Sequence, residues 1–131
     1  MKECDRVTDL AARNRRNKRK GADWEAALRD GFREEQYDIE RLHLNGADDE
    51  GDLVIRMAGG AFVVIEAKNA KFEPSTFLRQ MEIEVENFRK NRGLDAELVS
   101  GVVIVKRPRV SWRKAYVLTT VERYFGLGDA Q

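Results

Sequence analysis

Apolar residues recur at helical spacing in two long parts of the chain. From 21 to 36 they stand three or four positions apart, and Asp23 is the expected N-cap. From 75 to 91 they again form one stripe, and Gly93 is the expected stop signal. We therefore predict helices over 21–36 and 75–91, and a short helical turn over 121–125. The stripes consist of Trp24, Ala27, Leu28 and Phe32 in the first helix and of Phe77, Met81, Val85 and Phe88 in the second.

Short apolar runs between the helical segments predict strands. The run Phe62-Val63-Val64-Ile65 is apolar on both faces, which is typical of a central strand covered on both sides. Gly59-Gly60, just before it, can take the positive φ angles of a tight hairpin. The polar segment 45–51 is long enough to be a functional loop. The five predicted strands cover 37–44, 52–57, 61–67, 101–105 and 115–120.

The resulting order of elements is α-β-β-β-α-β-β, which indicates an α/β (α+β) fold with a mixed central sheet flanked by helices. Residues 1–19 are strongly basic and have little apolar periodicity, so they are expected to form either a mobile basic arm or a frayed helix. We predict an arm over 1–19, one folded domain over 20–125 and a C-terminal tail over 126–131.

Length and composition exclude several classes of protein. A chain of 131 residues has the size of one domain with its own core. Cys4 is the only cysteine and His43 the only histidine, which rules out an intramolecular disulfide and a structural zinc site. No run of about 18 apolar residues exists, and the N-terminus lacks the apolar stretch of a secretory signal. We expect a soluble protein of a reducing, cytoplasmic compartment, without a membrane partner.

The net charge of +1 hides two basic clusters. Residues 1–20 hold eight basic and three acidic side chains, and residues 106–114 hold five basic side chains and no acid. Like charges this dense repel one another, so we expect an anionic partner. DNA is such a partner, and both segments could contact its phosphates without reading sequence. The alternative is that they are solvated surface. The candidate DNA-binding residues are Arg13, Arg15, Arg16, Lys18, Arg19, Lys20, Lys106, Arg107, Arg109, Arg113 and Lys114.

Charged residues at the ends of two neighbouring predicted strands form the candidate catalytic site. Glu66 and Lys68 point to the same face because side chains alternate along a strand, and a tight hairpin places Asp52 beside them. Carboxylates are ligands that Mg²⁺ prefers, and an ammonium group holds attacking water or offsets charge in the transition state. The pattern indicates metal-dependent phosphodiester hydrolysis. The alternative is that these charges mark where a buried strand reaches solvent.

Four short motifs carry a family resemblance: Lys20-Gly21-Ala22-Asp23-Trp24-Glu25, Gly31-Phe32, Gly51-Asp52-Leu53-Val54 and Ile65-Glu66-Ala67-Lys68. With them, the chain resembles the Holliday junction resolvases of the PD-(D/E)xK nuclease superfamily, above all archaeal and phage-encoded members, over about residues 18–120. Gly51 stands where the family usually has Pro before the first acid. The resemblance implies a restriction-endonuclease-like fold and a homodimeric enzyme that uses Mg²⁺, with Mn²⁺ as a substitute, to cut four-way DNA junctions in the cytoplasm, or in the host cytoplasm if it is phage-encoded.

The same resemblance implies roles for single residues. Glu25, Asp52, Glu66 and the backbone carbonyl of Ala67 would ligate the metal, and Lys68 would activate water or stabilise the transition state. Without the resemblance, Glu25 is equally well explained as an acid favoured by the dipole in the first turn of a helix.

Several other residues near these motifs each have two possible explanations. His43 either contacts the scissile phosphate or relays a proton, or it is an ordinary hydrogen-bonded strand residue. Gln80 and Glu84 are either auxiliary groups of the site or part of a solvated helix face. Trp112 either stacks on a base or packs at a dimer contact or core edge. Asp48, Asp49 and Glu50 do not form an EF-hand. That motif needs Gly at its sixth position and Glu at its twelfth, and the sequence has neither there.

Two other functions remain open from the sequence. One is a nuclease of the same fold that acts on ordinary duplex or on DNA ends. The other is a non-catalytic DNA-binding protein that retains the fold.

Overall fold

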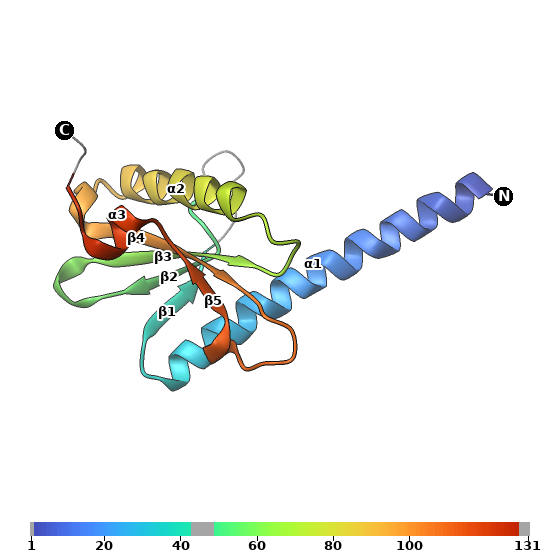
Figure 1. The fold of residues 1–131 in the computed structure, drawn as a ribbon, viewed down its shortest axis with the longest axis horizontal. Helices are drawn as coiled ribbons and strands as arrows, with labels where there is room; N and C mark the ends of the chain where they lie inside the picture. Colours follow the sequence, from blue (N-terminus) through green and yellow to red (C-terminus); the bar gives the residue numbers. More distant parts are fainter. Residues whose placement is uncertain (1, 43–48, 129–131) are drawn as a thin grey trace.

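The computed structural model describes residues 2–42 and 49–128, and its elements follow the predicted order (Figure 1). These residues form three α-helices and one five-stranded mixed sheet. The helices are α1 (Lys2–Glu34), α2 (Pro74–Asn91) and α3 (Val121–Phe125). The strands are β1 (Asp38–Arg41), β2 (Leu53–Arg56), β3 (Phe62–Lys68), β4 (Val99–Val105) and β5 (Tyr116–Leu118).

The strands lie in the spatial order β1-β2-β3-β4-β5, with β3 in the middle as its two-sided apolar pattern predicts. β3 pairs with β2 antiparallel, through the hairpin in which Gly59 and Gly60 both have a φ of 77°. It pairs with β4 in parallel, and α2 provides the crossover between them. The carboxyl end of β3 therefore lies beside the carboxyl end of β4 and the start of β2.

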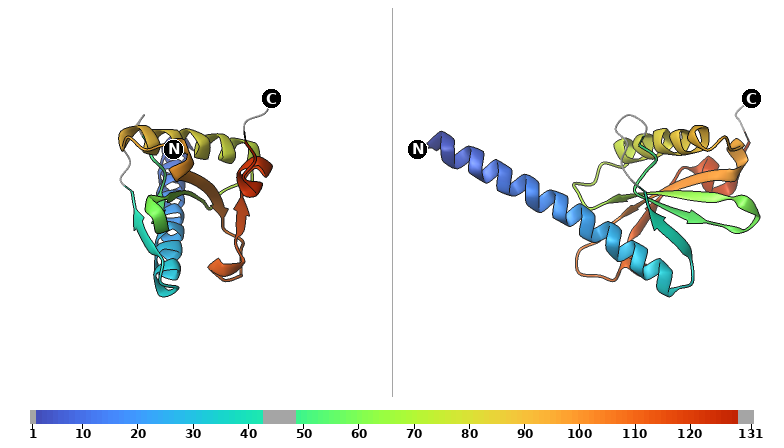
Figure 2. Two further views of the ribbon diagram at one scale, coloured as in Figure 1. Left: turned by 90° about the vertical axis from the view of Figure 1, so that its left-hand side faces the viewer. Right: turned by 180° about the vertical axis from the view of Figure 1, so that it is seen from behind.

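One helix packs on each face of the sheet (Figure 2). Met81, Val85 and Phe88 of α2 bury their side chains against Val64 and the neighbouring strand residues on one face. On the other face, Trp24 and Leu28 of α1 pack against β2, β3 and β4. The indole Nε1 of Trp24 donates a hydrogen bond to the carbonyl of Ile104, 3.2 Å away, which fixes α1 on the sheet.

The expected start of the first helix near residue 21, with Asp23 as N-cap, is wrong. α1 runs without interruption from Lys2 to Glu34. The basic segment is therefore helical, which was one of its two expected forms. Arg, Lys, Leu and Ala are strong helix formers, and a single Gly21 costs only about 1 kcal/mol inside a helix. The basic half of α1 continues the helix away from the sheet, where it projects from the body of the molecule (Figure 1).

The connection between β4 and β5 returns to α1 through Trp112. Its ring lies 5.0 Å from that of Phe32, and a Cβ on Gly31 would approach it to 2.3 Å, so only glycine leaves room for the indole there. Trp112 therefore packs at the edge of the core, which was one of the explanations offered for it. In the part of the chain that the structure describes, no helix has the length and apolar character of a membrane span.

Candidate active site

Asp52, Glu66 and Lys68 meet where β2 begins and β3 ends. The backbone N–H of Asp52 donates to the carbonyl of Ile65 at 3.1 Å, which aligns the two strands. The Oδ2 atom of Asp52 accepts a hydrogen bond of 2.8 Å from the backbone N–H of Ala67. Lys68 Nζ lies 3.8 Å from Glu66 Oε1, so the expected common face of these two side chains is confirmed.

Glu25 reaches the same site from α1. Its carboxyl group is close enough to Asp52 to share a hydrogen bond with it, and one of its oxygens lies 3.7 Å from the guanidinium of Arg41 on β1. Because α1 begins at Lys2, Glu25 lies deep inside the helix and the explanation by a first-turn dipole is wrong. Packing of α1 on the sheet, through Trp24 next to Glu25, is what places this carboxyl group beside Asp52.

α2 adds two polar groups from the opposite face. Gln80 Oε1 accepts a hydrogen bond of 2.7 Å from Lys68 Nζ. Glu84 is only 2% exposed and interacts with Glu66, so the solvated-face explanation is wrong for Glu84. Its position within the stripe of Met81, Val85 and Phe88 is the signal in the sequence that could have shown its burial.

Burial and mutual repulsion raise the pKa values of these acids. Desolvation is the largest cause for each of them. It raises the pKa of Asp52 to about 8 and that of Glu66 to about 8, assisted by the hydrogen bonds and charges that link Asp52 to Glu66 and Glu66 to Glu84. The pKa of Glu25 rises to about 7, with repulsion by Asp52 as the second cause. Burial also raises the pKa of Glu84.

The backbone before Asp52 accepts Gly51 and excludes the proline that the resolvases usually have at this position. Its φ is +104°, which proline cannot adopt, and its backbone N–H donates a hydrogen bond of 3.0 Å to Asp49 Oδ1. A Cβ at this position would lie 2.7 Å from Val64 and 3.4 Å from Glu84 Oε2. Glycine therefore leaves room for β3 and for the buried carboxyl group of α2.

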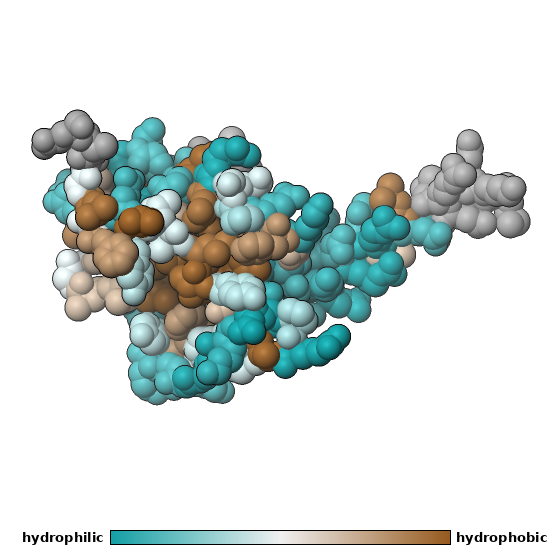
Figure 3. All heavy atoms as spheres, in the orientation of Figure 1, coloured by the Kyte–Doolittle hydropathy of each residue, from teal (hydrophilic) through white to brown (hydrophobic). Residues whose placement is uncertain are grey.

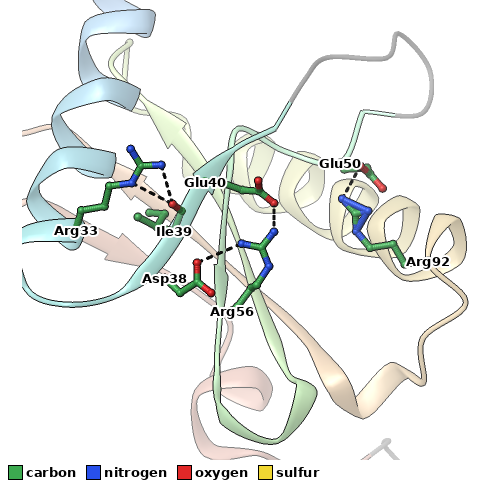
Figure 4. Close-up of polar contacts among 7 residues, drawn as sticks. All are labelled: Arg33, Asp38, Ile39, Glu40, Glu50, Arg56 and Arg92. Carbon is green, nitrogen blue, oxygen red and sulfur yellow. Dashed lines mark hydrogen bonds and ion pairs between the residues drawn. The ribbon is translucent and has the colours of Figure 1, made fainter.

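Glu50 is a buried acid whose role the sequence did not reveal. It is 6% exposed, and its oxygens lie 3.1 Å from Asn91 Nδ2 and 3.4 Å from Arg92 Nη2 at the end of α2. Figure 4 shows the pair with Arg92. The other ion pairs of that view, between Arg56 and both Asp38 and Glu40, lie on the exposed surface of β1 and β2. Glu50 thus anchors the segment before Asp52 to α2.

The donor set fits a magnesium ion that is completed by water and substrate. Among the described residues, no three His, Cys, Asp or Glu side chains are arranged to hold one ion. Mg²⁺ typically takes only one or two carboxylates from a protein and keeps waters and phosphate oxygens as its other ligands. Asp52 and Glu66 supply two carboxylates, and Glu66 Oε2 and Glu84 Oε2 are buried without a hydrogen-bond partner. A cation would compensate these buried oxygens.

The predicted DNA-binding residues fall into separate groups. Those of α1 are all exposed along its projecting half: Arg13, Arg15, Arg16, Lys18, Arg19 and Lys20. Lys106 and Arg109 line a cleft together with Lys20. Arg107 donates to the carbonyl of Lys114 at 3.0 Å, and Arg113 pairs with Glu35. His43 lies outside the described residues.

Comparison of the chain with protein-family models, with curated proteins and with solved structures finds no match. The grounds for a functional assignment are therefore the side chains gathered at the end of β3 and the short motifs that carry them.

Proposed function

We propose that this chain is a Mg²⁺-dependent, structure-selective DNA endonuclease with the restriction-endonuclease-like PD-(D/E)xK fold, and that it resolves four-way junctions. The observation that carries the proposal is the convergence of Glu25, Asp52, Glu66 and Lys68, from three elements, at the end of β3. The raised pKa values of the three acids, caused mainly by burial, are typical of functional sites.

Asp52, Glu66 and the carbonyl of Ala67 would hold the metal ion. Glu25, which the resemblance to the resolvases suggested as a further ligand, would lie beside Asp52 outside this set, because no three acids of the described residues are arranged around one ion. When bound, Mg²⁺ supplies Lewis acidity to a phosphoryl oxygen and lowers the pKa of coordinated water. The backbone N–H of Ala67 fixes one oxygen of Asp52, so this carboxylate is oriented before substrate arrives. The strand pairing between Asp52 and Ile65 holds both acid-bearing strands in register.

Lys68 would act on the water or on the phosphate. Gln80 and Glu66 hold its ammonium group from two sides, at 2.7 Å and 3.8 Å, so its Nζ atom is positioned at the mouth of the carboxylate cluster. There it can donate a hydrogen bond to the attacking water or to a non-bridging oxygen on which negative charge increases. Gln80 is a positioning residue in this scheme.

A four-way junction has two strands to cut that are related by a two-fold axis, and a C2 dimer would present one site to each. An exposed apolar surface on β5 and α3 supports dimerisation (Figure 3). Such patches on soluble proteins mark contacts with other macromolecules. We define this apolar surface by Tyr116, Val117, Val121, Tyr124 and Phe125.

Cleavage of a labelled four-way junction, compared with a linear duplex of the same sequence, tests the proposal. We expect Mg²⁺-dependent cutting of the junction, and a loss of at least roughly a hundredfold in Glu66→Gln with junction binding retained. Glu86→Gln is the matched control, because Glu86 lies on α2 and pairs with Arg89 on the surface.

Each rival function has its own outcome in this assay. Equal rates on junction and duplex would favour a nuclease that acts on ordinary DNA. Wild-type protein that binds the junction but stays inert with both Mg²⁺ and Mn²⁺ would favour a non-catalytic DNA-binding protein.

A further inference from the structure

A cleft of about 540 Å³ lies beside the candidate active site and plays no part in the scheme above. Three segments line it: the middle of α1, the connection from β3 to α2, and the connection from β4 to β5. The two connections lie close to α1 where the helix leaves the sheet (Figures 1 and 2). The lining includes Lys20, Asn69, Lys71, Lys106, Pro108 and Arg109.

The cleft is cationic and uncompensated. Four of its lining residues are Lys or Arg, and no acid lines it. Across the described ranges 2–42 and 49–128, none of these four forms an ion pair, whereas Arg113 of the same β4–β5 connection is paired with Glu35. Arg109 also holds a φ of 65°, a strained backbone form that tends to occur at functional sites. Cations from separate segments in one hollow favour a polyanion.

The cleft begins where the carboxylate site ends. Asn69 directly follows Lys68, and the backbone N–H of Lys106 donates to the carbonyl of Lys68 at 2.9 Å. The Lys106 ammonium lies 5.9 Å from the ring of Trp24, the residue before Glu25. A strand with one phosphate at the carboxylates would therefore continue past Lys68 into the cleft.

We propose that this cleft binds the backbone phosphates next to the scissile phosphate on the cleaved DNA strand, an inference that rests on the proposed nuclease function. Such contacts fix the register of the strand and carry no sequence information, as a structure-selective enzyme requires. Lys20 connects the cleft to Arg16 and Arg13, which lie on the same stripe of α1. The phosphate track therefore runs from the site through the cleft and along the projecting helix.

The salt dependence of junction binding tests the cleft in full-length, metal-free protein. The double variant Lys71→Gln/Lys106→Gln should bind about tenfold more weakly. The slope of log affinity against log salt should be shallower by about 1.8 for each bound chain, which is about 0.9 for each lost phosphate contact. Lys90→Gln, which removes one positive charge at the exposed end of α2, should leave the slope unchanged, whereas either single cleft variant should reduce it by about 0.9 for each bound chain. A double variant with the wild-type slope would overturn the proposal.

Neutral methylphosphonate linkages locate the contact along the strand. Placed one at a time beside the mapped cleavage position, at least one should weaken wild-type binding yet have little further effect on the double variant. Additive losses at every position would overturn the assignment of the cleft to neighbouring phosphates.

The cleft and the nuclease activity can fail separately. Wild-type protein that cuts junctions, with a double variant of unchanged slope, contradicts only the cleft. Wild-type protein that never cuts, with the expected change of slope, contradicts the nuclease and supports the cleft as a site for DNA phosphates alone, with no scissile phosphate beside it.

Discussion

Burial separates Glu66 and Glu84 from most charged residues of the described chain, although Glu50, outside the site, is buried too. Glu66 and Glu84 are 3% and 2% exposed, although carboxylates are rarely buried without a partner. Strand alternation was enough to predict that Glu66, Lys68 and Asp52 meet, because it is a local rule. For Glu84, the place within the apolar stripe of α2 signals burial, but its contact with Glu66 was not predictable in the same way, because it depends on β3 packing over α2.

The raised pKa values predict how the stability of metal-free protein depends on pH. The pKa of Asp52 rises from 3.8 to about 8 and that of Glu66 from 4.5 to about 8, so the folded chain binds protons more tightly than the unfolded chain. The stabilising contribution is fully present below the unfolded pKa values and is lost as pH rises through the folded ones. We expect the free energy of unfolding in EDTA to decrease between about pH 5 and pH 8.

Denaturant unfolding at several pH values in EDTA measures this effect. The variant Asp52→Asn/Glu66→Gln, which replaces both acids with neutral groups of similar shape, should have a flatter profile. Addition of Mg²⁺ should stabilise the wild-type protein most at high pH, where the carboxylates are ionised. Parallel profiles for the wild-type and variant proteins would contradict the proposed protonation of the buried acids.

At the scale of elements, the two halves of α1 differ in what they contact. Its second half carries the apolar stripe with Trp24 and Leu28 and packs on the sheet. Its first half has only exposed or half-exposed side chains from Asp9 to Lys20, so no packing within the described molecule explains its sequence. A helix without a buried face that is rich in cations suits a groove or backbone of DNA, and an α-helix fits the major groove.

Substitution of three exposed arginines tests this role of α1. The variant Arg13→Gln/Arg15→Gln/Arg16→Gln keeps good helix formers and should therefore keep the helix. We expect weaker junction binding and a shallower salt slope, by about 0.9 for each arginine that contacts a phosphate. Circular dichroism controls for helix content. An unchanged slope with unchanged helicity would assign this half of α1 to solvent.

At the scale of the whole molecule, the projecting cationic half of α1 lies away from the apolar surface of β5 and α3 (Figure 3). The cleft lies closer to that surface, because the ring of Tyr116 is 6.1 Å from that of Phe72, next to Lys71, and 5.1 Å from the guanidinium of Arg107, next to Lys106. Tyr124 is 75% exposed although it is a large aromatic residue. This placement would let two chains associate through α3 and the neighbouring part of β5 while the proposed DNA-binding residues of α1 stay accessible.

The oligomeric state tests this arrangement. We expect a dimer in solution, and a shift to monomer in Val121→Glu/Tyr124→Glu, because buried charges without partners disrupt an apolar interface. Leu10→Glu, on the exposed first half of α1, should stay dimeric. Sedimentation velocity distinguishes the two states. A dimer that only Leu10→Glu dissociates would place the interface on α1.

The sequence by itself determined the order of elements, the central position of β3 and the meeting of Asp52, Glu66 and Lys68, because periodicity and strand alternation act over a few residues. It also predicted α2 to within one residue at its start. Tertiary structure decided what depends on contacts between distant segments. The burial of Glu84, the place of Glu25 beside Asp52 and the cleft around Lys20, Lys71 and Lys106 all arise where α1, α2 and the connections pack onto one sheet. The length of α1 was missed for a different reason, since a polar helix needs no apolar stripe to form.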